Sequence, residues 1–100
     1  MRVVFEAGAV AQIKHIRDWI AERAGSDTAD RIADGIIARC ESLAEFPHRG
    51  TPRDDVRPGL RTIPHRRRYT IGYRVVGRKV VILGVRAAGQ RDDALGGGRT

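Results

Sequence analysis

Two neighbouring stretches with helical periodicity constrain the fold of this chain more than any other feature. In residues 9–23 apolar side chains recur every three or four positions, which predicts a helix with one apolar face. A second such stretch follows Gly25, with Ser26 or Asp27 as the expected N-cap, and ends before Pro47. Helices joined by about three residues run antiparallel, so we expect an αα-hairpin.

The apolar faces of these helices predict which side chains enter the core. Cys40 lies on the face of the second helix, and we expect a small buried hydrophobe rather than a nucleophile. Gly35 lies inside the same helix, where glycine costs about 1 kcal/mol relative to alanine. We expect it to permit close approach of the two helices. The predicted face of the first helix comprises Val10, Ile13, Ile16, Trp19 and Ile20.

The rest of the chain has the periodicity of strands. Residues 2–6 and 60–63 are short β-prone segments. In residues 69–75 apolar and polar side chains alternate, so one face is apolar. Residues 79–86 are almost continuously apolar, as in a central strand covered on both sides, and residues 76–78 form the turn before it. The apolar face of the alternating strand comprises Tyr69, Ile71, Tyr73 and Val75.

The order of these elements is β-α-α-β-β-β. It predicts an α+β domain in which an N-terminal strand and an αα-hairpin pack on a small, largely antiparallel β-sheet. Residues 47–59 form a turn-rich connection between the helices and the later strands. We expect a single domain over residues 1–95 and a flexible, glycine-rich tail over residues 96–100.

The positive charge of the chain is concentrated in its second half. The net charge is +7, and 17 of the 19 basic residues are Arg. Residues 1–50 carry 7 basic and 8 acidic groups, whereas residues 51–100 carry 12 and 4. This asymmetry predicts a surface for an anionic partner. The run Arg66-Arg67-Arg68 is either a footprint for nucleic acid or an acidic peptide, or a solvated hairpin connection.

Several classes of function have no support in the sequence. Cys40 is the single cysteine, and the three histidines show no ligand spacing, so we expect no disulfide, metal or cofactor. No apolar run reaches the length of a membrane span, and the N-terminus does not resemble a secretory signal. The composition fits the cytoplasm. The five aromatic residues lie mostly at predicted core positions, which argues against a base-stacking platform.

One segment carries a family resemblance. Residues 46–55, F-P-H-R-G-T-P-R-D-D, and residues 57–61, R-P-G-L-R, resemble the ParE branch of the ParE/RelE toxin superfamily. The strand Y-T-I-G-Y-R at residues 69–74 and the closing strand that leads to Arg86 and Arg91-Asp92 do so as well. The resemblance covers Val3 to about Asp93. It implies a toxin of a bacterial type II toxin–antitoxin system that inhibits DNA gyrase and is neutralised by a ParD-like antitoxin.

The RelE branch, whose members cut mRNA on the ribosome, is the alternative. That branch places an Arg after the strand Tyr, where this chain has Thr70, and a Tyr near the C-terminus, where this chain has A-L-G-G-G. The resemblance therefore implies no catalytic residues; Arg61, Arg74 and Arg91 would be the candidates in a nuclease. A basic module that binds nucleic acid directly is a third hypothesis, which the missing aromatic residues disfavour.

The resemblance also suggests two groups of binding residues. Acidic side chains of the antitoxin would pair with arginines on the sheet, and its apolar side chains would contact the helix hairpin. Basic C-terminal residues that the core does not need would contact the target. The residues expected to bind the antitoxin are Trp19, Arg61, Arg74 and Arg86. The residues expected to bind the target are Arg86, Gln90, Arg91 and Asp92.

Overall fold

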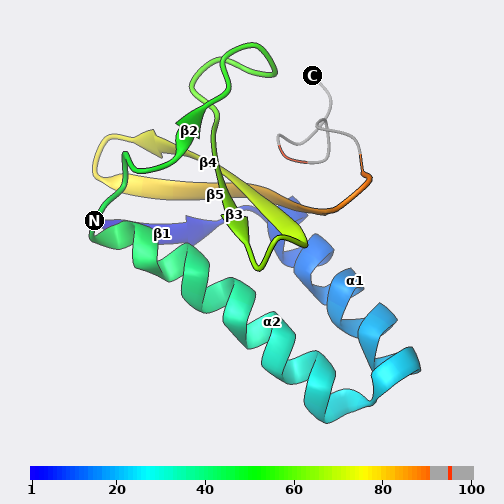
Figure 1. Ribbon diagram of the computed structural model, residues 1–100. Coiled ribbons are helices and arrows are strands. Elements are labelled where there is room, and N and C mark those ends of the chain that lie inside the picture. Colours follow the sequence, from blue (N-terminus) through cyan, green and yellow to red (C-terminus); the bar gives the residue numbers. More distant parts are fainter. Residues whose placement is uncertain (91–94, 96–100) are drawn as a thin grey trace.

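The computed structural model describes residues 1–90 and Leu95. Both helices lie on one face of a five-stranded sheet (Figure 1). The predicted α+β order is confirmed, with one addition: a two-residue strand in the segment expected to be only turns. The elements are β1 (Arg2–Phe5), α1 (Ala7–Ala24), α2 (Ser26–Glu41), the 3₁₀ turn η1 (Ser42–Ala44), β2 (Thr51–Pro52), β3 (Arg61–His65), β4 (Tyr69–Val76) and β5 (Lys79–Ala87).

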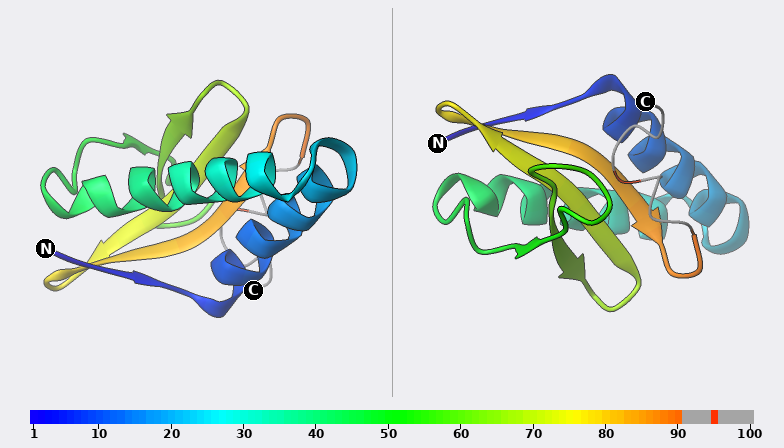
Figure 2. Two further views of the ribbon diagram at one scale, coloured as in Figure 1. Left: turned by 90° about the horizontal axis from the view of Figure 1, so that it is seen from below. Right: turned by 90° about the horizontal axis from the view of Figure 1, so that it is seen from above.

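The sheet has the strand order β1-β5-β4-β3-β2. β1 runs parallel to β5, and the other three pairings are antiparallel. The αα-hairpin forms the crossover between β1 and the rest of the sheet, as Figure 2 shows from two sides. β5 therefore lies inside the sheet between β1 and β4, which confirms the prediction drawn from its apolar sequence.

A bulge explains why that sequence is apolar almost throughout. Gly72 lies opposite Gly84 but the next residue, Tyr73, lies opposite Ile82, so β5 contains one extra residue. The alternation of side chains shifts at this point. Val80, Ile82 and Val85 enter the core beneath the helices, whereas Leu83 packs on the other face.

The helices are joined by Gly25 alone, not by three residues. Its φ of 91° lies in a region that glycine enters without strain, and this allows the chain to reverse within one residue. Ser26 is already helical, and no side chain caps α2. The expected N-cap at Ser26 or Asp27 was therefore wrong, because Gly25 is the one residue between the helices and occupies the N-cap position.

The apolar face of α1 is narrower than its sequence predicted. Ile13 and Ile20 are buried, as expected. Val10 and Trp19 are each 53% exposed, since they stand on the flanks of the buried stripe. Phe46 is 61% exposed, so Trp19 and Phe46 are exposed, whereas the other three aromatic residues pack in or against the core, as expected for most of them.

Gly35 serves a different contact from the one expected. A Cβ atom at this position would lie 3.5 Å from Nε2 of His65 on β3, so the glycine faces the sheet and not α1. Burial is the main cause that lowers the pKa of His65, and the charges of Arg66 and Arg39 lower it further. Cys40 is buried as expected, and burial raises the pKa of its thiol to about 12.

The sheet face opposite the helices carries a second, smaller core. Leu60, Leu83 and Leu95 are buried there together. Gly72 lies beneath them, and a Cβ atom on it would come within 2.9 Å of both Cβ and the carbonyl oxygen of Leu95. The C-terminal part of the chain thus contacts the sheet at Leu95, while the proposed tail at residues 96–100 lies outside the described residues.

Candidate partner-binding site

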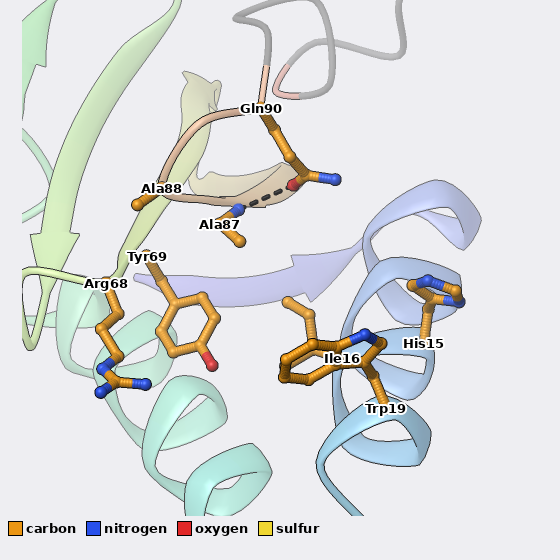
Figure 3. A pocket seen from close by; sticks show the side chains of 8 residues that line it. All are labelled: His15, Ile16, Trp19, Arg68, Tyr69, Ala87, Ala88 and Gln90. Carbon is orange, nitrogen blue, oxygen red and sulfur yellow. Dashed lines mark hydrogen bonds between the residues drawn. The ribbon is translucent and has the colours of Figure 1, made fainter. Parts of the chain in front are cut away.

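A pocket of about 390 Å³ opens between α1 and one end of the sheet. It forms where the second half of α1 faces the start of β4 and the end of β5, and Figure 3 shows its side chains converging from these elements. The lining is mostly apolar and aromatic, with a guanidinium, an imidazole and a carboxamide around it. The lining residues are His15, Ile16, Trp19, Arg68, Tyr69, Ala87, Ala88 and Gln90.

Trp19 forms one wall and is held in place by its own helix. The guanidinium carbon of Arg23 lies 3.8 Å from the centre of the indole ring, in a cation–π contact. Nη1 of Arg23 also donates a hydrogen bond to the Trp19 carbonyl at 2.9 Å. An indole that is half exposed yet fixed can serve as a preformed anchor, because little side-chain entropy is lost when a partner binds it.

The opposite wall is fixed by backbone hydrogen bonds. Gln90 Oε1 accepts a bond from the Ala87 N–H at 2.7 Å, and the Gln90 N–H donates to the Ala87 carbonyl at 3.1 Å. The Ala88 N–H donates to the Arg68 carbonyl at 2.8 Å, which joins this wall to the β3–β4 turn. Ala87 and Ala88 on this wall have small side chains, so they leave the pocket open.

These groups can hold part of a binding partner. None of the described lining residues is a carboxylate. The pocket can hold an apolar side chain against Trp19 and Tyr69, while Arg68 can pair with an acidic neighbour of that side chain. Elsewhere in the described residues, no group of three His, Cys, Asp or Glu side chains could hold a metal ion.

Two predicted residues, one from each group, meet at this pocket. Trp19 was expected to bind the antitoxin and Gln90 the target, yet both line the same cavity. Tyr69 and His15 were missed as candidates, and Arg68 was considered only as part of the run Arg66-Arg67-Arg68. Tyr69 follows the alternation of a core strand, and nothing in a linear pattern indicates that the core ends at this residue.

Arg61 lies elsewhere and holds a loop. Its Nη1 donates to the carbonyl of His48 at 3.0 Å and to that of Gly50 at 2.9 Å. The Gly50 N–H donates to the buried Tyr73 hydroxyl at 2.8 Å, and burial is the main cause that raises the pKa of this tyrosine. The loop that carries the family-like segment is therefore tied to the sheet from two sides.

Arg74 and Arg86 lie on the sheet face opposite the helices. Arg74 lies opposite Val81 in the sheet, and Val81 packs against the second core. Arg86 comes directly after Val85, whose side chain points to the helices, so the side chain of Arg86 points to the other face. Both side chains are half-buried. The four residues expected to bind the antitoxin therefore occupy three separate places. Arg91 and Asp92 lie outside the described residues.

Comparison with known proteins identifies the class to which this fold and charge pattern belong. Residues 3–92 match the family described as ParE toxin of type II toxin-antitoxin system, parDE. The chain belongs to this toxin family. A search of curated proteins finds no match.

A solved structure described as "Chromosomal ParDE TA system from P. aeruginosa" shares the fold. The TM-score is 0.78, and the match covers 87% of this chain and 95% of that one at 24% identity. The predicted toxin-like architecture is thereby confirmed. In the part of the chain that the structure describes, no helix is long and apolar enough to cross a membrane.

Proposed function

We propose that this ParE-family chain inhibits DNA gyrase in the cytoplasm and is neutralised by a ParD-like antitoxin. The observation that carries the proposal is the family match, which spans residues 3–92 and so includes all helices and strands except the first residue of β1. The chain would act by binding rather than by catalysis, since the pocket offers apolar and aromatic anchors for a partner.

The pocket is the proposed anchor point for the antitoxin. A disordered antitoxin segment that folds on binding needs apolar contacts to offset its ordering entropy. Trp19 and Tyr69 provide such contacts, and the positively charged Arg68 lines the same pocket. An antitoxin segment with an aliphatic side chain next to a carboxylate would match this arrangement.

Arg74 and Arg86 are proposed as a second contact for acidic side chains of the antitoxin. They lie on the face that also carries Leu95, so one partner would have to wrap around the sheet to reach both this face and the pocket. Wrapping of this kind is common for segments that fold on binding. The target surface is proposed at the end of β5, around Arg86 and Gln90, continuing into Arg91 and Asp92.

Co-expression with the antitoxin tests the pocket. Trp19→Ala should weaken capture of the toxin by tagged antitoxin by at least about tenfold, since truncated aromatic anchors typically cost about 2 kcal/mol or more. Phe46→Ala is the matched control, because Phe46 is also an exposed aromatic residue but lies outside the pocket. Equal capture of both variants would contradict the proposed anchor.

A further inference from the structure

The turn between β3 and β4 adopts a backbone conformation that its side chains do not favour. Arg66 and Arg67 have φ values of 55° and 60°, in the left-handed region. The Arg68 N–H donates to the His65 carbonyl at 3.2 Å, so these two arginines are the central residues of a tight turn. Positive φ at both central positions is typical of a type I′ turn, where Asn and Gly are preferred.

The turn at the other end of the same sheet has a glycine at its positive-φ position, as is preferred. Between β4 and β5 the positive φ, 59°, falls on Gly77. Within residues 1–90 and Leu95, every other positive φ also falls on a glycine. A strained conformation that is kept at two arginines points to side chains with a role of their own.

The side chains of this turn form a concentrated positive charge, which we call the arginine tip: Arg66, Arg67 and Arg68. All three are exposed, and none forms an ion pair with another described residue. The turn projects past α2 in both views of Figure 2. Arg39 on α2 adds a fourth guanidinium close by, since its Nε donates to the carbonyl of Pro64 at 3.2 Å.

We propose that the arginine tip binds the phosphodiester backbone of a nucleic-acid duplex. Guanidinium groups match phosphate oxygens, and backbone contacts need neither apolar anchors nor aromatic platforms. The scarcity of exposed aromatic residues therefore argues against base stacking but not against this mode. An acidic peptide is a poorer fit, because the tip offers no apolar side chain for the centre of a protein interface.

This contact goes beyond the proposed gyrase and antitoxin interactions and does not depend on them. Two of the three arginines of the tip, Arg66 and Arg67, do not line the pocket, whereas Arg68 does. The contact is independent of base sequence and strongly dependent on salt, since it consists of phosphate neutralisation and counterion release.

The test is the salt dependence of binding to a short duplex DNA by the full chain. Arg66→Asn/Arg67→Gly should reduce the slope of log affinity against log salt by about 2, because two phosphates would no longer be neutralised. The same variant should raise the melting temperature, because it installs the preferred turn residues. Weaker DNA binding together with a gain in stability cannot result from misfolding.

Two further variants distinguish DNA binding by the arginine tip from a general effect of net charge. Arg2→Ser/Arg78→Ser removes two exposed arginines at the opposite end of the sheet and should leave the slope nearly unchanged. Arg66→Lys/Arg67→Lys keeps the charge and should keep most of the slope. Equal reductions of the slope in the tip variant and the Arg2/Arg78 variant would overturn the proposal. So would a tip variant that binds DNA normally but no longer binds poly-glutamate, which would assign the tip to an acidic protein.

Discussion

The two faces of the sheet are closed in different ways. On one face, two long helices bury Ile36, Ile71 and Tyr73 completely. On the other, a single residue from the end of the chain, Leu95, packs with Leu60 and Leu83 over Gly72. Among the described residues, the helix-side core comprises twelve buried residues, whereas the second core comprises three. The comparison teaches that the helix side carries the larger core and also borders the pocket at Trp19, whereas the smaller core depends on the packing of Leu95.

Truncation of the helix-side core should have the largest effect. Ile36→Ala should lower the free energy of unfolding by about 2–5 kcal/mol, because a fully buried aliphatic side chain leaves a cavity. Urea denaturation measures the change. Val10→Ala, on the same side but 53% exposed, should stay within about 0.5 kcal/mol of the parent. Similar losses of stability for the two variants would contradict the assignment of the core.

Displacement of Leu95 should have a smaller effect. In Gly72→Ala the new Cβ would clash with Leu95, so this leucine should leave its position at a cost of about 1.5–3 kcal/mol. Leu95→Ala should cost a similar amount, and the double variant should cost little more than either single one. Gly8→Ala is the control, since a Cβ atom there meets nothing within 4 Å and alanine favours the helix. Additive costs in the double variant would show that Gly72 and Leu95 do not interact.

Removal of the Tyr73 hydroxyl should cost about 1–3 kcal/mol, because the Gly50 N–H would be left without its partner in a buried place. Thermal unfolding of Tyr73→Phe measures this. Tyr69→Phe changes a half-buried tyrosine and should have almost no effect on stability. A Tyr73→Phe protein as stable as the parent would mean that the loop at Gly50 is held by Arg61 alone.

The smallest expected effect is the dependence of the free energy of unfolding on pH. Burial, helped by Arg66 and Arg39, places the pKa of His65 in the folded state below its ordinary 6.5. The unfolded chain therefore binds the proton more readily, so the free energy of unfolding should fall as the pH drops below about 6.5. His65→Gln should flatten this part of the stability curve. A curve that His65→Gln leaves unchanged would exclude this cause.

Local patterns predicted the helices, the strand order along the chain and the central position of β5, because each follows from spacing within one element. They did not predict the pocket at Trp19. Trp19 belongs to a regular apolar stripe in the sequence, and only its position on the flank of the buried stripe shows that it is exposed. Nothing in the sequence distinguishes Arg61 from a solvated charge, but it bonds to two carbonyls of a loop more than ten residues away.

The two sheet faces also differ in how well the sequence predicted which residues they contain. Alternation in β4 identified the helix-side residues correctly. The other face requires the bulge in β5 and the return of Leu95 to Gly72, and both depend on contacts between segments that are distant in sequence. The family resemblance indicated a toxin function, which the spacing of residues could not indicate. Part of the resemblance lies in the loop that Arg61 and Tyr73 hold in place.

The most direct measurement is gyrase supercoiling with ATP in the presence of the purified protein, run beside an assay of mRNA integrity in a translating extract. The proposed function predicts that supercoiling is lost, that linear DNA accumulates, and that mRNA stays intact; added ParD-like antitoxin should restore supercoiling. Ribosome-dependent cleavage of mRNA with gyrase unaffected would contradict it and make this chain a nuclease.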